Sequence, residues 1–351
     1  MGVSLRALGR CSATGANTLV IRPRHPLLLL PLKRLLCLRF RLRTRRWRVQ
    51  PCPADDVGGS SHVDLRSTCT VDRLHMSLQV AGHPGTVSAP GSGAWVVKQC
   101  GAIEAAFYDA TWHASLDVPA DVLRDVRRIL PACGGVADTD GRWLHGWPAH
   151  ADVPPPVRGS WSVALENLVY PFALADVCDI KIGTALYDAA DTSVSAEKRA
   201  RMERKVAETT SGTHGVRVTG YRVWDAHTRA YKAVGKGPGR AARTDAELRA
   251  LLVDALNVRS PRRAAAICER LLPRVEMVRA VLARTPVVMR GASLLIVTEA
   301  GVDEPRFDVR VIDFAHTRWA SAPEEGVLYG LDTLTLSLIH ISEPTRQAEI
   351  S

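Results

Sequence analysis

The chain has 351 residues and a formal net charge of +10 at neutral pH. A chain of this length can bury a sizeable core, and it fits either one two-lobed domain or two small domains. No apolar run approaches the ~20 residues that a membrane-spanning helix needs, so the composition predicts no membrane span. The eight cysteines show no Cys-x-x-Cys spacing, which predicts reduced thiols in an intracellular protein and no zinc site.

The basic residues are concentrated in a leader, residues 1–75. It holds 14 Lys and Arg against 4 acids, which leaves 32 basic and 32 acidic residues in the rest of the chain. The neutral body therefore argues against nucleic acid as its partner. The leader is typical of a mitochondrial transit peptide or a basic nucleus-directing arm, or it is translated non-coding DNA. We expect it to be disordered.

The next segment, residues 79–98, alternates short apolar runs with Gly, Pro and Ser, which predicts a small antiparallel sheet. Its last strand ends on Lys98, which either faces phosphates or lies in solvent, as a lone Lys usually does. Glu104 opens a helical stretch and either orients Lys98 or faces solvent. Residues 163–168 then read as an apolar strand that leads into a polar joint.

A run Asp-Ile-Lys-Ile-Gly occupies residues 179–183. As a strand, its period of two puts Asp179 and Lys181 on one face and the two isoleucines on the other. An acid and a base then point into a cleft together. Far downstream, Asp313 lies between apolar strand residues and Phe314, a setting that presents a lone carboxylate to a metal ion. Phosphoryl transfer requires this combination of a cation and a Mg²⁺-binding acid.

Residues 195–208 are predicted to form a helix with Ser195 as its N-cap. Lys198, Arg201 and Lys205 lie on one of its faces at three- and four-residue spacing. Such a face suits a polyanionic substrate, because a rigid helix holds the cations in register. A solvated helix face that also carries glutamates is the alternative.

The alternating run of residues 215–231 predicts a hairpin with one wet face. Arg217 and Arg222 then fall on opposite faces, so at most one of them can point at a ligand. The stretch Gly-Lys-Gly-Pro-Gly-Arg at residues 235–240 lacks the Ser or Thr of a Walker A sequence. We expect it to be a mobile surface loop.

The remaining elements are scaffold, apart from the strand that delivers Asp313. Residues 245–256 and 262–284 have the periodicity of amphipathic helices, and Pro273 is expected to kink or divide the second. Residues 292–298 predict a buried strand whose antiparallel partner is formed by residues 307–314.

The two charged runs resemble the signature of the inositol polyphosphate kinases, a Pro-x-x-x-Asp-x-Lys-x-Gly motif with a late Asp-Phe that binds Mg²⁺. The resemblance extends over residues 79–334. Further short matches occur in the same order at residues 79–83, 97–98, 104–108, 210–212, 293–296 and 330–331. One departure is that the family proline would stand at Ala175, so the entry to this strand differs.

The resemblance implies an α+β, two-lobed kinase-like fold with a small antiparallel-sheet N-lobe and a larger mixed α/β C-lobe. After the leader, residues 76–166 would form the ATP-binding N-terminal lobe, and residues 167–335 the catalytic, inositol-phosphate-binding C-terminal lobe. Residues 336–351 resemble the translation of a transposase sequencing adapter. We expect them to be read-through and assign no function to His340.

The resemblance also implies the residues of the site. Asp179 and Lys181 would be catalytic, and Asp313 would bind Mg²⁺. The ATP-binding residues would be Lys98, Glu166, Leu168 and Asp313. Of these, Glu166 and Leu168 would bind adenine through their backbone groups. The substrate-binding residues would be Lys181, Arg201, Lys205 and His316. Asp179 could deprotonate the attacking hydroxyl, orient it or hold the ribose. A lone His is more often a structural residue, which is the alternative for His316.

The predicted function is ATP- and Mg²⁺-dependent phosphorylation of a hydroxyl of a soluble inositol polyphosphate. Tris- and tetrakisphosphates would be converted towards the pentakisphosphate, as by the multikinases of fungal type. The first alternative is an inositol hexakisphosphate kinase that makes pyrophosphates, and the second is a non-catalytic nuclear regulatory scaffold. Nucleic-acid binding by the basic leader is a third. We expect a monomer in the nucleus, the cytoplasm or both.

Overall fold

The computed structural model describes residues 87–88, 93–113, 116–145, 153–189, 191–192 and 194–350, with side chains described as far as residue 343. The predicted leader and most of the segment before residue 93 lie outside these residues. Among the helices within these ranges, none is long and apolar enough to cross a membrane.

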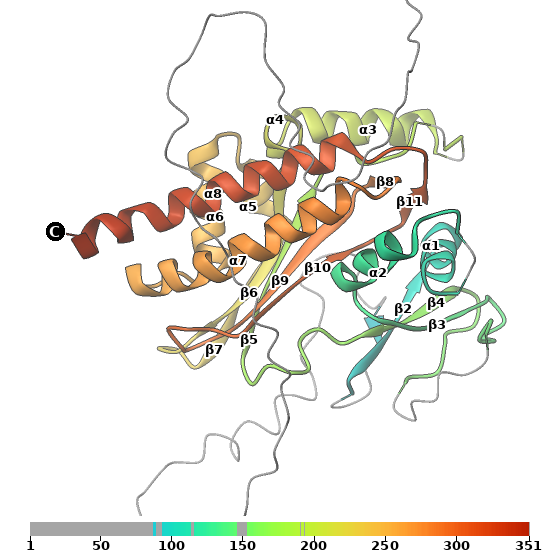
Figure 1. Ribbon diagram of the computed structural model, residues 1–351, viewed down its shortest axis with the longest axis horizontal. Helices are drawn as coiled ribbons and strands as arrows, with labels where there is room; N and C mark the ends of the chain where they lie inside the picture. The colour runs from blue at the N-terminus through green and yellow to red at the C-terminus, as the bar shows by residue number, and fades with distance from the viewer. Residues whose placement is uncertain are drawn as a thin grey trace, which may run out of the picture. The chain divides into compact units, whose positions relative to one another are not determined.

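The first sheet is antiparallel and has the strand order β1-β2-β4-β3 (Figure 1). Its strands are β1 (Val87–Ser88), β2 (Trp95–Cys100), β3 (Cys133–Ala137) and β4 (Trp161–Glu166). Between β2 and β3 the chain forms α1 (Ala102–Trp112) and α2 (Ala120–Ile129). The apolar residues Phe107 and Tyr108 of α1 are buried in the core, which anchors this helix next to the sheet.

The second sheet has the order β10-β9-β5-β6-β7, and every neighbouring pair is antiparallel. Its strands are β5 (Ala175–Ile182), β6 (Val216–Asp225), β7 (Ala230–Val234), β9 (Ser293–Glu299) and β10 (Phe307–Ile312). A separate antiparallel pair consists of β8 (Val287–Arg290) and β11 (His316–Trp319). The two strands predicted over residues 292–298 and 307–314 are thus confirmed as neighbours.

The helices of the second half are α3 (Ala196–Ala207), α4 (Thr210–His214), α5 (Lys236–Ala241), α6 (Asp245–Ala255), α7 (Pro261–Leu282) and α8 (Glu325–Ile350). Ser195 caps α3 as predicted, since its side chain accepts from the Lys198 amide. The two long helices α7 and α8 run side by side over the second sheet (Figure 1). Their apolar faces bury the isoleucines of β5 in the main core.

Two local predictions were wrong. The hairpin has no solvent-exposed face along most of β6, because β6 is an inner strand whose first eight residues are buried. Residues 236–241 form helix α5 instead of a mobile loop, because Gly239 lets the helix backbone approach the carbonyl of Val218. The proline at position 273 does not divide the assigned helix α7, and the kink expected there stays a prediction. Pro273 is exposed, so water can bond to the carbonyl that the proline leaves without a donor.

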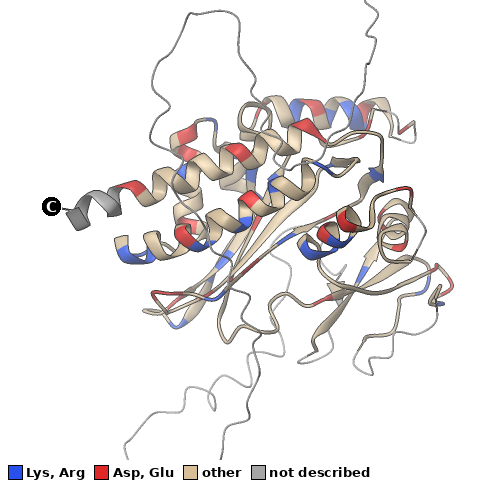
Figure 2. Cartoon of the chain, in the orientation of Figure 1, with Lys and Arg blue, Asp and Glu red and all other residues tan. Residues whose placement is uncertain are grey.

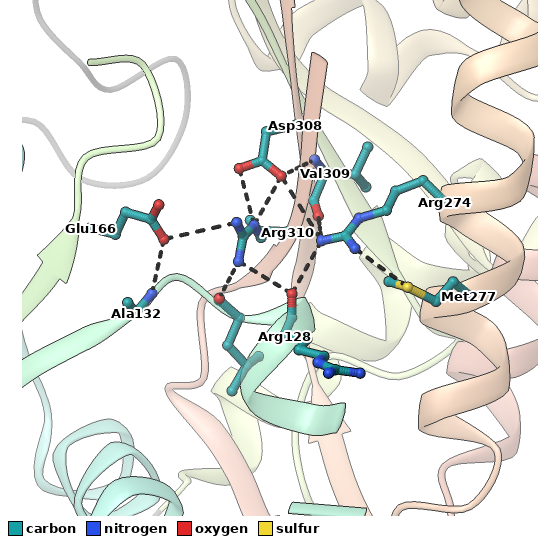
Figure 3. A network of polar contacts seen from close by, with 9 residues as sticks. Arg128, Ala132, Glu166, Arg274, Met277, Asp308, Val309 and Arg310 are labelled. Atoms are coloured by element: carbon teal, nitrogen blue, oxygen red, sulfur yellow. Dashed lines mark hydrogen bonds and ion pairs between the residues drawn. The ribbon is translucent and has the colours of Figure 1, made fainter. Parts of the chain in front are cut away.

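Two arginines from the second half of the chain hold the C-terminus of α2 (Figure 3). Arg274 of α7 donates to the carbonyls of Arg128 at 3.1 Å and Val309 at 3.2 Å. Arg310 of β10 donates to the carbonyls of Arg128 at 3.2 Å and Leu130 at 3.0 Å. The last carbonyls of a helix have no partner within it, so these guanidinium groups satisfy them.

The same network reaches the segment that joins the two sheets. Arg310 also donates to both carboxylate oxygens of Asp308, at 2.9 and 3.0 Å, and lies 4.0 Å from the carboxylate of Glu166 at the end of β4. That carboxylate accepts from the amide of Ala132 at 3.2 Å (Figure 3). The end of β4 is thereby connected to β10, the strand that precedes Asp313.

The interpretation of residues 336–351 as read-through stays a prediction. Helix α8 is continuous from Glu325 to Ile350 and thus includes most of this segment. Leu338 is fully buried in the main core. The boundary predicted between the lobes also stays a prediction, although β4 ends at Glu166 and β5 begins at Ala175.

Candidate functional site

A cavity of about 550 Å³ lies among residues of both sheets. Of the nine predicted site residues, eight line it: Lys98, Glu166, Leu168, Asp179, Lys181, Lys205, Asp313 and His316. The alternation predicted for β5 is confirmed, because Asp179 and Lys181 face this cavity while the neighbouring isoleucines are buried in the core. Arg201 is exposed on α3 and is not part of the wall.

Two lysines and two acids form an ion cluster at the centre of the cavity. The Lys98 Nζ lies 2.7 Å from Glu104 Oε1 and 2.8 Å from Asp313 Oδ1. The Lys181 Nζ lies 3.1 Å from Asp313 Oδ2 and also donates to the carbonyl of Gly291. Each oxygen of Asp313 thus accepts from a different ammonium group.

The alternative that Glu104 faces solvent is wrong. Its side chain is only 3% exposed, and its Oε1 accepts from the backbone N–H of Phe314 at 3.1 Å as well as from Lys98. Phe314 is fully buried and packs against Phe107 of α1, with ring centroids 4.6 Å apart. Glu104 therefore holds both the lysine of β2 and the backbone next to Asp313.

The cluster shifts the pKa values of Lys98 and Asp313 in opposite directions. Burial alone would lower the pKa of Lys98, but the charges of Asp313 and Glu104 and their hydrogen bonds raise it above its ordinary value. Burial alone would raise the pKa of Asp313, but Lys181 and Lys98 hold it well below its ordinary value. Lys98 stays cationic and Asp313 stays anionic at neutral pH, as phosphate and metal binding require.

The backbone orients Asp313 in an unusual way. It is the first residue after β10 and has a φ of 66°, in the left-handed region that L residues other than Asn and Asp rarely adopt. Strained conformations of this kind concentrate at functional sites, where the surrounding structure imposes them. Here the flanking contacts are the strand before Asp313 and the Glu104 bond to the amide that follows it.

Asp179 is a second buried carboxylate in the cavity. Its Oδ1 accepts from Thr219 Oγ1 at 2.5 Å, and the pairing of β5 with β6 shifts register at this residue. Burial raises the pKa of Asp179, Lys181 opposes this shift and the charge of Asp313 adds to it. The hydrogen bond from Thr219 holds a carboxylate that faces the same space as Asp313.

A basic wall closes one end of the cavity. Lys205 comes from α3, which carries basic and acidic residues interleaved (Figure 2), and Arg217 comes from β6. Partial burial and the charges of Arg217, Arg240, Lys236 and Arg201 lower the pKa of Lys205. Burial and the charge of Arg240 lower the pKa of Arg217. These cations repel one another and would be stabilised by a polyanion.

The sequence predicted part of this wall and missed the rest. Arg217 and Arg222 do lie on opposite faces, since Arg217 lines the cavity while Arg222 stacks over the ring of Tyr231 at 4.7 Å. Lys236 and Arg240 were assigned to a mobile loop. The Gly-Pro-Gly run at residues 237–239, whose last glycine permits α5 to approach β6, could have indicated them, but only once the strand position was known.

The joint between the sheets lines the opposite part of the cavity. The backbone N–H of Glu166 donates to the carbonyl of Ala132 at 2.9 Å, so only its carbonyl remains available for a ligand. The N–H of Leu168 makes no hydrogen bond to any residue that the structure describes. One acceptor and one donor are therefore positioned two residues apart, as adenine recognition by backbone groups requires.

His316 begins β11 and is half-buried at the basic end of the cavity. Its Nδ1 is buried and lacks a hydrogen-bond partner among the described residues. Burial and the charges of Lys198 and Lys181 lower the pKa of His316. A neutral imidazole is thus available to hydrogen-bond a ligand.

The cavity fits a metal that arrives with a phosphate ligand. In the described ranges, no group of three or more His, Cys, Asp or Glu side chains could hold a metal ion by itself. Mg²⁺ commonly binds through one or two carboxylates together with substrate phosphates and water. Asp313, with Asp179 facing the same space, supplies such a donor set.

Comparison with known proteins identifies relatives. A family model described as inositol polyphosphate kinase matches residues 162–339. The chain is 28% identical over 207 residues to mouse inositol hexakisphosphate kinase 3, covering 51% of this chain and 50% of that protein. It is 28% identical over 180 residues to the inositol polyphosphate multikinase of Schizosaccharomyces pombe, covering 49% and 66%. The chain thus spans between half and two thirds of these relatives.

A shorter match and two solved structures complete the comparison. Over 61 residues the chain is 44% identical to the multikinase of Saccharomyces cerevisiae, covering 17% of this chain and 16% of that protein. The S. cerevisiae multikinase Ipk2, solved with ADP and Mn²⁺, superposes with a TM-score of 0.55 at 24% identity, over 71% of this chain and 99% of that one. A second multikinase structure gives 0.52 at 21% identity, over 68% and 99%. The predicted α+β kinase-like fold is confirmed.

Proposed function

The chain belongs to the inositol polyphosphate kinase family, and we propose that it transfers the γ-phosphoryl group of ATP to a hydroxyl of an inositol polyphosphate. The observation that carries this proposal is the position of the ion cluster. Asp313 lies between Lys98 and Lys181, in a cavity whose wall runs from the joint between the sheets to the basic residues of α3 and β6. A nucleotide and a polyanion can therefore meet at one carboxylate.

The nucleotide would bind from the side of the joint. Adenine would accept a hydrogen bond from the Leu168 amide and donate one to the Glu166 carbonyl. Lys98 would move its contact from Asp313 to the nucleotide phosphates, while Glu104 keeps it oriented. Asp313 would hold Mg²⁺, which supplies charge neutralisation at the phosphate oxygens. The Mn²⁺ and ADP of the S. cerevisiae structure support a nucleotide and a divalent metal at this fold.

The acceptor would bind from the basic side. Lys205 and Arg217 would hold its phosphates, and His316 would hydrogen-bond the acceptor with its neutral ring. Lys181 would neutralise the charge that develops on the transferred group. Asp179 would orient the attacking hydroxyl and accept its proton, because its raised pKa makes it a better base than an exposed carboxylate. Arg201, which is outside the wall, would act at longer range.

The substrate we favour is a tris- or tetrakisphosphate, converted towards the pentakisphosphate. The 44% identity with the S. cerevisiae multikinase favours this choice over the hexakisphosphate kinase reaction. The hexakisphosphate kinases match over a longer part of the chain, but at 27–29% identity. Incubation with ATP and each inositol phosphate, followed by chromatography of the products, separates the two activities.

A single substitution tests the chemistry. Asp313→Asn removes the charge that would hold the metal, so we expect turnover to fall by roughly a hundredfold or more. Asp303→Asn is the matched control, because Asp303 is exposed in the turn between β9 and β10. If Asp313→Asn consumes ATP with inositol trisphosphate at the wild-type rate, the assignment of Asp313 as the metal-binding residue is wrong. If the wild-type chain itself consumed no ATP with any inositol phosphate, the interpretation as a scaffold would be favoured instead.

A further inference from the structure

One cation at the basic end of the cavity was not anticipated from the sequence. Arg290 is the last residue of β8, and its register partner is His316, the first residue of β11. The next residue, Gly291, accepts a hydrogen bond from the Lys181 side chain through its carbonyl. Backbone pairing therefore places Arg290 beside two residues that we assign to the acceptor, and Arg290 itself lines the cavity.

The guanidinium of Arg290 is held by one edge only. Its Nη1 donates to Glu324 Oε1 at 2.7 Å, and the two side chains are 24% and 11% exposed. Its Nε is buried and has no hydrogen-bond partner among the residues described. A buried donor without an acceptor is unfavourable, and native structures satisfy such groups with few exceptions. The cavity is the space from which an acceptor can come.

We propose that Arg290 binds a phosphate group of the inositol polyphosphate and that Glu324 fixes the orientation of its guanidinium. This inference rests on the proposed function. With Nη1 engaged by Glu324, Nε and Nη2 have no hydrogen-bond partner among the described residues, and a phosphate at this edge would take the bidentate geometry in which Arg surpasses Lys. Lys205 and Arg217 hold the acceptor from α3 and β6, and Arg290 holds it from the β8–β11 pair.

The neighbouring acids do not compete for this edge. Asp188 and Glu325 are close enough to Glu324 to affect its carboxylate, but Asp188 is paired with Arg318 of β11. Glu324 is also fixed by the start of α8, because its carbonyl accepts from the amides of Val327 and Leu328 at 3.1 and 3.2 Å. Arg290 therefore keeps its orientation without a ligand, which lowers the conformational entropy lost on binding.

The test uses the full chain and a charge-neutral double variant, Arg290→Met with Glu324→Gln. It removes both members of the ion pair, so it leaves no buried unpaired carboxylate and no change in net charge. The matched control is Arg318→Met with Asp188→Asn, which removes the neighbouring ion pair in the same way. Thermal unfolding establishes that both double variants fold. A third variant, Arg290→Lys, retains the positive charge but loses the guanidinium group that can donate two hydrogen bonds to one phosphate.

The measurement is calorimetric titration with inositol trisphosphate and, separately, with an ATP analogue. We expect the dissociation constant for inositol trisphosphate to rise roughly ten- to a hundredfold in the Arg290 double variant, since a hydrogen-bonded charge contact is lost. It should rise less in Arg290→Lys and less than about twofold in the control. ATP-analogue binding should be unchanged in all three, which a general disturbance of the fold would not give.

Two results would overturn the inference, and they differ. If the wild-type protein binds and phosphorylates an inositol phosphate but the Arg290 double variant binds it as tightly as the control does, Arg290 is not a substrate residue and the proposed function stands. If the wild-type protein neither binds nor phosphorylates any inositol phosphate, the proposed function fails and the role of Arg290 fails with it.

Discussion

Replacement of Glu104 tests whether the ion cluster holds the two parts of the site together. Glu104 Oε1 accepts from Lys98 Nζ at 2.7 Å and from the Phe314 N–H at 3.1 Å. Glu104→Ala removes a charge-assisted bond worth about 1.5–3 kcal/mol and leaves the buried N–H of Phe314 without a partner, at a further cost of roughly 1–3 kcal/mol. Lys98 keeps its contact with Asp313. The expected loss of stability is therefore near the lower end of the sum of these two contributions, at about 3 kcal/mol.

A second substitution separates charge from hydrogen bonding. In Glu104→Gln the amide oxygen can still accept from both donors, so only the charge attraction is lost, at about 1 kcal/mol. A change of 1 kcal/mol shifts the Tm of a protein of this size by roughly 2–4 °C, so we expect the Ala variant to melt roughly 6–12 °C lower and the Gln variant roughly 2–4 °C lower. The Ala variant should also show a raised KM for ATP, because Lys98 loses one of its two anchors.

The assay is thermal and urea-induced unfolding of the full chain, with Glu269→Ala as the control. Glu269 is exposed on α7 and has no ion pair or side-chain hydrogen bond within the described part of the chain, so its loss should change stability by less than about 0.5 kcal/mol. If Glu104→Ala unfolds at the same temperature and urea concentration as Glu269→Ala, the cluster does not join β2 to the residues after β10, and the reasoning is refuted.

Three further predictions concern the walls of the cavity and the network behind it. Because its lowered pKa makes Lys205 lose its proton at a lower pH than an ordinary lysine, the KM for the inositol phosphate should rise as the pH is raised through that pKa. Lys205→Arg should abolish this rise in a pH series. Gly239→Ala would place a Cβ 1.8 Å from the Val218 carbonyl oxygen, so it should displace α5 and lower stability by about 1–3 kcal/mol in urea unfolding. Arg310→Leu removes donors from the carbonyls that end α2 and from Asp308, and should cost about 2 kcal/mol by the same measurement.

The features that the sequence predicted correctly are local ones. The side-chain period of a strand is a property of neighbouring residues, so it placed Asp179 and Lys181 on the cavity face of β5 without knowledge of the fold. The cap of α3 is equally local, because Ser195 bonds to an amide three residues away. The sequence also placed Asp313 at the end of a strand, because the short run before it alternates apolar and charged residues.

The features that the sequence did not predict depend on distant pairing. Lys98 and Asp313 are separated by 215 positions, and nothing in either segment indicates that one ammonium group contacts that carboxylate. The burial of Glu104 follows from that contact. Arg290 enters the cavity because β8 pairs with β11, and the alternating pattern of β6 gave the wrong exposure because helices and strands cover both of its faces.

The two ends of the cavity differ in how their charges are balanced, and this difference explains why a polyanion should bind at one end. In the central cluster each lysine contacts an acid, so the cluster is stable without a ligand. On the basic wall, neither Lys205 nor Arg217 forms an ion pair with an acid within the ranges that the structure describes. Burial and the repulsion of neighbouring cations together lower the pKa of Lys205. A ligand with several phosphates would remove that repulsion, so binding at this end should strengthen with the number of phosphates and weaken steeply with salt.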